Sequence, residues 1–181
     1  MKKVLSLVLV LVLCMAMSAM AATDSPTNPI LPPIDKVNIV SYPEIGLKGD
    51  PAGAVDASSL VAKLNSQGKE AVLGADVAAM VDAVSSGKLV TVVPMKMTSE
   101  YDVSMGDVTI TIGVPAAQSL SAGTKVAVAV AIPNGVADGQ TAYVWSVFEG
   151  VANGNGGVET TLKADVVAKI AVGGAMVAIF A

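Results

Sequence analysis

Two serine–lysine pairs are the residues in this sequence best suited to nucleophilic chemistry. Ser66 with Lys69 and Ser85 with Lys88 have the Ser-x-x-Lys spacing in which a lysine can take the hydroxyl proton of a serine. The chain has no histidine, so no imidazole base is present. Both pairs fall where a predicted helix ends at a glycine, and the Ser-Asp-Asn and Lys-Thr-Gly motifs of penicillin-recognising enzymes are absent from the sequence. We therefore expect no enzymatic activity.

Three acidic residues form a second group that could do chemistry. Glu100, Asp102 and Asp107 lie close together in the sequence, between two predicted strands. Carboxylate pairs hydrolyse glycosides, and carboxylate oxygens bind Ca²⁺. The segment lacks the ligand alternation of a recognised calcium loop. We interpret it as a solvated acidic loop, with a calcium site as the alternative, and expect no cofactor.

Two aromatic residues form the third group. Tyr143 and Trp145 are two positions apart in a predicted strand, so their side chains share one face. An exposed face of this kind stacks against sugar rings. Trp145 is the only tryptophan in a chain that is 3% aromatic, so a β-sandwich is expected to need it in its core. Core packing is the favoured interpretation, and glycan binding is the alternative.

Composition excludes further classes of protein. All 11 basic residues are lysines, and the net charge is −4. Without arginine the chain lacks the planar side chain that grips phosphate through two hydrogen bonds, so we expect no nucleic-acid partner. The single cysteine, Cys14, lies in a segment expected to be removed, which leaves no disulfide or thiolate site.

The N-terminus has the pattern of a secretory signal peptide. Lys2 and Lys3 precede an apolar run over residues 4–17 and the small-residue site Ala19-Met20-Ala21. Cleavage after Ala21 would change the net charge from −4 to −6, because both lysines leave. The run is shorter than the roughly 20 residues that cross a bilayer. We expect export to the periplasm, the cell surface or the medium, with no membrane span after cleavage.

The remaining chain divides into three stretches. Residues 22–51 are rich in proline and predict an extended linker with an edge strand near 36–40. Residues 52–88 predict two short helices, because apolar residues recur at helical spacing after Asp56 and again after Asp76. Residues 89–181 predict strands, and we expect 52–181 to form one folded unit.

Alternating side chains dominate the last stretch. In residues 108–112, Val-Thr-Ile-Thr-Ile places aliphatic side chains on one face and threonines on the other. About seven strands are predicted, over residues 89–97, 108–112, 126–132, 143–149, 158–164, 166–172 and 175–180. Gly173-Gly174 is expected to be a tight hairpin turn between the last two. The expected fold is mainly β (α+β): an antiparallel Ig-like β-sandwich preceded by two short helices.

A family resemblance is visible in three segments of the last 90 residues. GDVTITIGVP (106–115), TAYVWSVFEG (141–150) and KADVVAKIAVGGAMVAIFA (163–181) resemble small Ig-like β-sandwich modules of bacterial surface proteins. The resemblance implies a stalk, spacer or adhesive unit and assigns no site residue.

The sequence therefore predicts a non-enzymatic, exported or envelope protein with a structural or protein-interaction role. The alternative is a ligand-binding module for a glycan or a small apolar molecule, which in its glycan form requires Tyr143 or Trp145 to be exposed. Partners would be envelope proteins or a second copy, joined by strand addition at residues 36–40 or at the C-terminal strand.

Overall fold

The computed structural model describes residues 31–137 and 139–181. The predicted signal peptide, its cleavage site and the first part of the proline-rich stretch lie outside the described residues. Within the described part of the chain, no helix is both long enough and apolar enough to cross a membrane.

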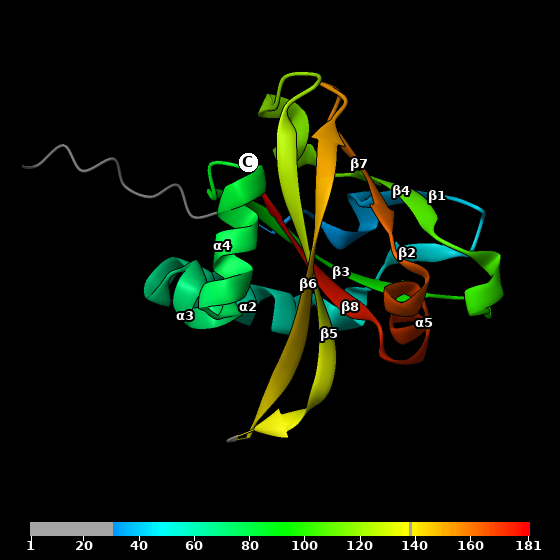
Figure 1. Cartoon of the computed structure of the whole chain (residues 1–181), viewed down its shortest axis with the longest axis horizontal. Coiled ribbons are helices and arrows are strands. Elements are labelled where there is room, and N and C mark those ends of the chain that lie inside the picture. Colours follow the sequence, from blue (N-terminus) through cyan, green and yellow to red (C-terminus); the bar gives the residue numbers. More distant parts are fainter. Residues whose placement is uncertain (1–30, 138) are drawn as a thin grey trace, which may run out of the picture.

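The chain is mainly antiparallel β structure with short helices (Figure 1). The strands are β1 (Asn38–Tyr42), β2 (Leu47–Gly49), β3 (Leu89–Met97), β4 (Val108–Gly113), β5 (Lys125–Ala137), β6 (Gln140–Ala152), β7 (Gly157–Leu162) and β8 (Ala175–Phe180). The α-helices are α2 (Ala54–Gln67), α3 (Lys69–Leu73), α4 (Ala75–Val84) and α5 (Ala164–Gly173). Short 3₁₀ turns are η1 (Ile34–Lys36), η2 (Pro51–Gly53), η3 (Val103–Met105) and η4 (Pro115–Ser119).

The strands form one sheet in the order β1-β4-β7-β6-β5-β8-β3-β2, with every neighbouring pair antiparallel. The two outermost strands, β1 and β2, follow each other in sequence and contact each other, so the sheet is nearly closed into a barrel. The expected Ig-like sandwich needs two facing sheets. It is replaced here by one curled sheet, because the stretch predicted as a linker supplies both outermost strands.

One hydrophobic core fills the inside of the curled sheet. Alternation along β5 turns Val126, Val128 and Val130 inward, where they meet residues of β4, β7 and β8. Helix α5 adds Val167 and Ile170 to the same cluster, and both are fully buried. The buried face of α5, which lies between β7 and β8 in the chain, therefore packs against this core, while its other face is exposed.

A second core lies on the outer face of the same strands. The alternate residues of β5 (Ala127, Ala129 and Ala131) face α2 and α4, which contribute Leu60 and Val81. Alanine has a short side chain, so the helices approach the sheet closely. In Figure 1 the three helices α2, α3 and α4 lie together beside the β5–β6 hairpin. β5 and β8 are thus buried on both faces over much of their length.

Residues 166–172 were expected to be a strand, and this prediction is wrong, because they form most of α5. Val166, Val167 and Ile170 are the buried residues of the helix, which is a helical rather than an alternating pattern. Alanines favour the helix, and Asp165 lies in its first turn. Gly174 has φ +71° and ends it, so the two glycines close a helix instead of turning a hairpin.

The predicted helical region holds three helices instead of two. Gly68 and Gly74, both with positive φ, separate α2, α3 and α4. Asp56 lies in the first turn of α2, and Gly53 occupies the N-cap position.

Candidate ligand-binding groove

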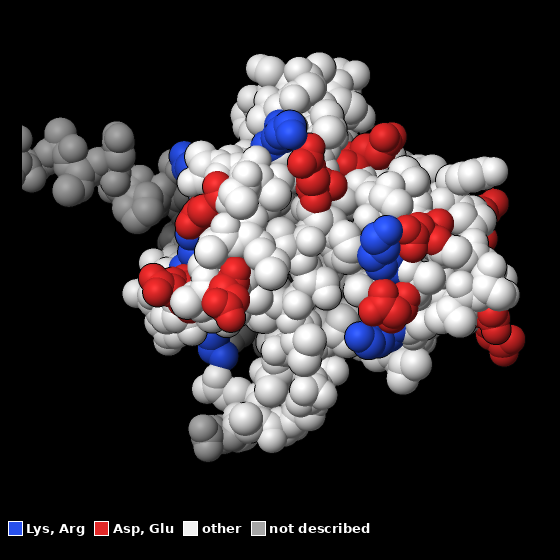
Figure 2. Space-filling view, in the orientation of Figure 1, with Lys and Arg blue, Asp and Glu red and all other residues white. Residues whose placement is uncertain are grey.

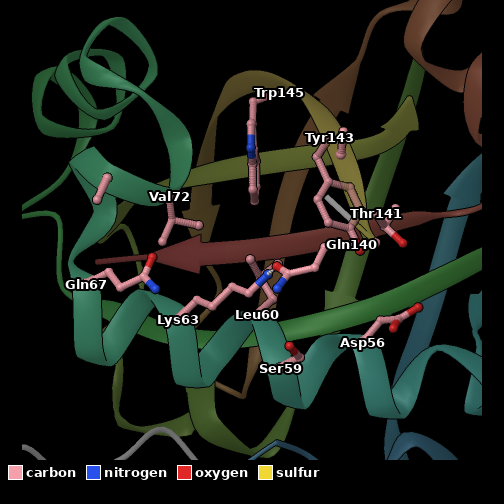
Figure 3. Close-up of a pocket in the computed structure, with 13 residues that line it drawn as sticks. Asp56, Ser59, Leu60, Lys63, Gln67, Val72, Gln140, Thr141, Tyr143 and Trp145 are labelled. Atoms are coloured by element: carbon pink, nitrogen blue, oxygen red, sulfur yellow. Dashed lines mark hydrogen bonds between the residues drawn. The ribbon is translucent and has the colours of Figure 1, made fainter. Parts of the chain in front are cut away.

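A groove of about 570 Å³ lies between the β5–β6 hairpin and helices α2 and α3 (Figure 3). The hairpin is formed by two 13-residue strands, and its outer part extends beyond the body of the protein (Figure 1). The groove is lined from one side by residues 139–143 and 145 and from the other by α2 and α3. Its size is within the usual range for small-molecule sites.

Helix α2 presents one row of polar side chains to the groove. Asp56, Ser59, Lys63 and Gln67 recur every three or four residues, so they lie along one flank of the helix. The adjacent face of α2 carries its buried apolar residues, which hold the helix on the sheet. The packing of one face therefore determines where the polar flank points.

The aromatic pair, predicted to pack in the core with glycan binding as the alternative, lies on the facing strand. Tyr143 and Trp145 are on the helix side of β6, with ring centroids 6.2 Å apart and ring planes inclined by 52°. Both rings are half-buried: they pack against the outer core and also line the groove. Figure 3 shows them above the α2 side chains. Each ring thus has both a core contact and an accessible part.

Polar contacts define the chemistry of the groove. The ammonium group of Lys63 donates a hydrogen bond to the side-chain oxygen of Gln140, which joins α2 to the hairpin. Burial, reinforced by the charge of Asp56, raises the pKa of Tyr143 above its usual value. The phenol is therefore protonated at neutral pH and available as a hydrogen-bond donor. Carboxylate, amide and hydroxyl groups surround the aromatic pair.

The three acidic candidates do not gather at this groove. The carboxylate of Asp102 accepts from the Ser104 backbone N–H (2.8 Å), and hydrogen bonds from Ser104 lower its pKa. Asp107 binds Lys163, with 2.7 Å between Oδ2 and Nζ, and Glu100 is exposed. No cluster of three metal-ligating side chains occurs among the described residues. Asp102 and Asp107 thus hold a turn and a helix start, and we propose no calcium site.

The Ser-x-x-Lys pairs are not assembled either. The hydroxyls of Ser66 and Ser85 donate to backbone oxygens one helical turn earlier, at distances of 2.8 and 3.4 Å. Lys69 forms an ion pair with Asp82 of α4. These serines and this lysine have structural contacts at helix ends.

The groove also contains residues that were not predicted from the sequence, namely Asp56, Lys63 and Gln140. A polar row on one flank of an amphipathic helix is visible in the sequence, but it is the ordinary appearance of a solvated surface. Only the position of the hairpin beside α2 makes that flank part of a groove.

Comparison with known proteins found no match among family models, curated proteins or solved structures.

Proposed function

We propose that this protein is an exported, non-enzymatic binding module, and that the groove between α2 and the β5–β6 hairpin binds a carbohydrate. The supporting observation is the accessible pair Tyr143 and Trp145 opposite a row of polar side chains. The export part of the proposal rests on the N-terminal signal pattern in residues 1–21.

Sugars match this lining because they have two kinds of surface. Their C–H faces are apolar and pack on aromatic rings, while their hydroxyls donate and accept hydrogen bonds. In the groove, Trp145 and Tyr143 provide the rings, and Asp56, Lys63 and Gln67 provide charged and amide partners. A purely apolar ligand would leave these polar groups without water or hydrogen-bond partners, at a cost in binding free energy.

The proposal is for binding without hydrolysis. Glycoside hydrolysis ordinarily uses two carboxyl groups on either side of the scissile bond. Among the described residues that line the groove, Asp56 is the only one with a carboxylate. A single carboxylate beside amides and a lysine suits recognition of hydroxyl groups.

The direct test uses Trp145 as its own reporter, because it is the only tryptophan of the chain. An array of neutral, acidic and amino-sugar oligosaccharides identifies a ligand, and titration with that ligand should change the tryptophan emission in a saturable way. Calorimetry should then show binding weakened tenfold or more by Trp145→Ala, a loss of about 1.4 kcal/mol. Tyr143→Ala should weaken it by about 0.5–1.5 kcal/mol.

A matched control is Tyr42→Ala, because Tyr42 is 82% exposed on β1 and does not line the groove. This variant should bind with the affinity of the unmodified chain. The proposal fails if no oligosaccharide on the array binds, or if the bound sugar is held equally well by Trp145→Ala.

A further inference from the structure

Strand β6 has a long edge that no other strand covers. On one side it pairs with β5 along nearly its whole length, from Gln140 to Val151. On the other side it pairs with β7 only at residues 150–152. In Figure 1, β7 meets β6 at one end and then turns away, while the rest of β6 continues alone beside β5. Although β6 is an inner strand in the sheet order, its residues 140–149 therefore have one unpaired edge.

The hydrogen-bond pattern shows which backbone groups face this edge. The N–H of Ala152 donates to Thr124 O (2.9 Å), on the β5 side. The backbone N–H and C=O groups of every second residue from Ala152 back toward Gln140 therefore point toward β5. The residues between them are turned outward, and Glu149 O indeed accepts from the Thr160 hydroxyl on the β7 side (2.8 Å). The outward groups of Tyr143, Trp145 and Val147 have no backbone partner among the described residues.

This edge lacks the features that protect exposed edges. Proteins usually block an edge strand with a charged side chain, a proline or a bulge. Residues 140–148 contain no charged residue and no proline, and the irregularity of this hairpin lies in β5, between Pro133 and Val136. In Figure 2 the charged side chains gather to either side of an uncharged strip over the middle of the molecule. The edge is thus open to another strand.

The two segments predicted for strand addition differ in how their edges are paired. The C-terminal strand β8 lies between β5 and β3, and β1 pairs with β4 and contacts β2. The C-terminal strand thus has both edges paired, which corrects the expectation of assembly there. Assembly through residues 36–40 stays a prediction, because β1 is an end strand that pairs only with β4.

We propose that a second copy of this chain pairs with the edge of residues 140–148, forming a two-fold dimer through antiparallel β6 strands. An antiparallel strand pair about a two-fold axis is self-complementary, since each copy offers the same donors and acceptors in reverse order. Centred on Val144, the pairing places the outward groups of Tyr143 opposite those of Trp145 in the other copy. It brings no like charges together, because the segment has none. Val144 is 48% exposed and faces its own counterpart.

The test is sedimentation velocity over a wide range of protein concentration. It uses the protein as purified from the cells that express it. The unmodified protein should shift from one to two chain masses as concentration rises. Val144→Lys places two ammonium groups opposite each other and should leave the chain monomeric. The control Val136→Lys adds the same charge at the hairpin tip, where the residue is 74% exposed, and should still dimerise.

Two further measurements show whether Val144→Lys prevents strand pairing or prevents the chain from folding. A mixture of Val144→Lys and Val144→Glu should regain the dimer, because opposite charges then face each other across the axis. Val144→Cys should form an intermolecular disulfide under mild oxidation, and Val136→Cys should not. The proposal is overturned if the unmodified chain stays monomeric at every concentration. It is overturned equally if this edge pairs with a segment of a different protein and the chain does not pair with itself. It is also overturned if Val144→Lys dimerises as before, or if the charge-matched mixture stays monomeric.

Discussion

Asp107 connects two parts of the chain that are distant in sequence. Its carboxylate receives hydrogen bonds from Lys163 Nζ (2.7 Å) and from the backbone N–H of Ala164 (3.1 Å), so it lies at the N-terminus of α5. The bond from Lys163 is the larger cause, and with the Ala164 bond it holds the pKa of Asp107 below its usual value. The acidic segment therefore helps to set where α5 begins.

The resulting pH dependence has a definite sign. A carboxyl group whose pKa is lower in the folded chain stabilises the folded state at pH values above its pKa in the unfolded chain, which is about 3.9. This contribution is lost as the pH falls through the pKa of the folded chain. We expect Asp107→Asn to lower the free energy of unfolding at neutral pH and to flatten its decline at acid pH. Urea unfolding over a pH series measures both effects.

Glu100→Gln is the control for Asp107→Asn. Glu100 is exposed and has no hydrogen bond or ion pair among the described residues, so its neutral variant should keep the acid dependence of the unmodified chain. Equal effects of the two variants would contradict a specific role for Asp107.

At the scale of elements, α5 allows a direct test of helix against strand. In a strand, Ile170 and Val172 would share one face. In the helix, Ile170 is fully buried and Val172 is 91% exposed. We expect Ile170→Ala to cost about 2–5 kcal/mol of unfolding free energy and Val172→Ala less than about 0.5 kcal/mol. Similar costs for the two, measured by chemical denaturation, would show that the alternating strand pattern is correct.

At the scale of the molecule, the two hydrophobic cores share strands β5 and β8. Val130 faces the barrel interior, and its neighbours Ala129 and Ala131 face the helices. We expect Val130→Ala to lower stability by roughly 1–3 kcal/mol and to shift two transitions together: the far-ultraviolet circular dichroism and the emission of Trp145, which lies on the helix side.

Val136→Ala is the matched control, because Val136 lies on the same strand but is exposed at the hairpin tip. It should leave both transitions unmoved. If Val130→Ala shifts the circular dichroism and leaves the Trp145 transition in place, the helical layer unfolds independently of the barrel.

Strand positions were predictable where alternation coincides with turn residues. β3 and β8 have the predicted bounds, and β4, β5, β6 and β7 contain or overlap their predicted segments. Residues 166–172 were not predictable in this way, because a run of valine, alanine and isoleucine fits both periods. The aromatic pair was identified from the sequence, but its partners on α2 were not, since a polar helix flank has the same sequence whether it faces water or a groove.

The sequence by itself determined the local chemistry of this protein. The absence of arginine and histidine, the alternating strands and the shared face of Tyr143 and Trp145 depend only on residue types and on the geometry of a strand. Tertiary structure alone decided the closure of the sheet, the groove and the open edge of β6. Each of these depends on which distant segments meet, and alternation records which face of a strand is buried but not which strand lies beside it.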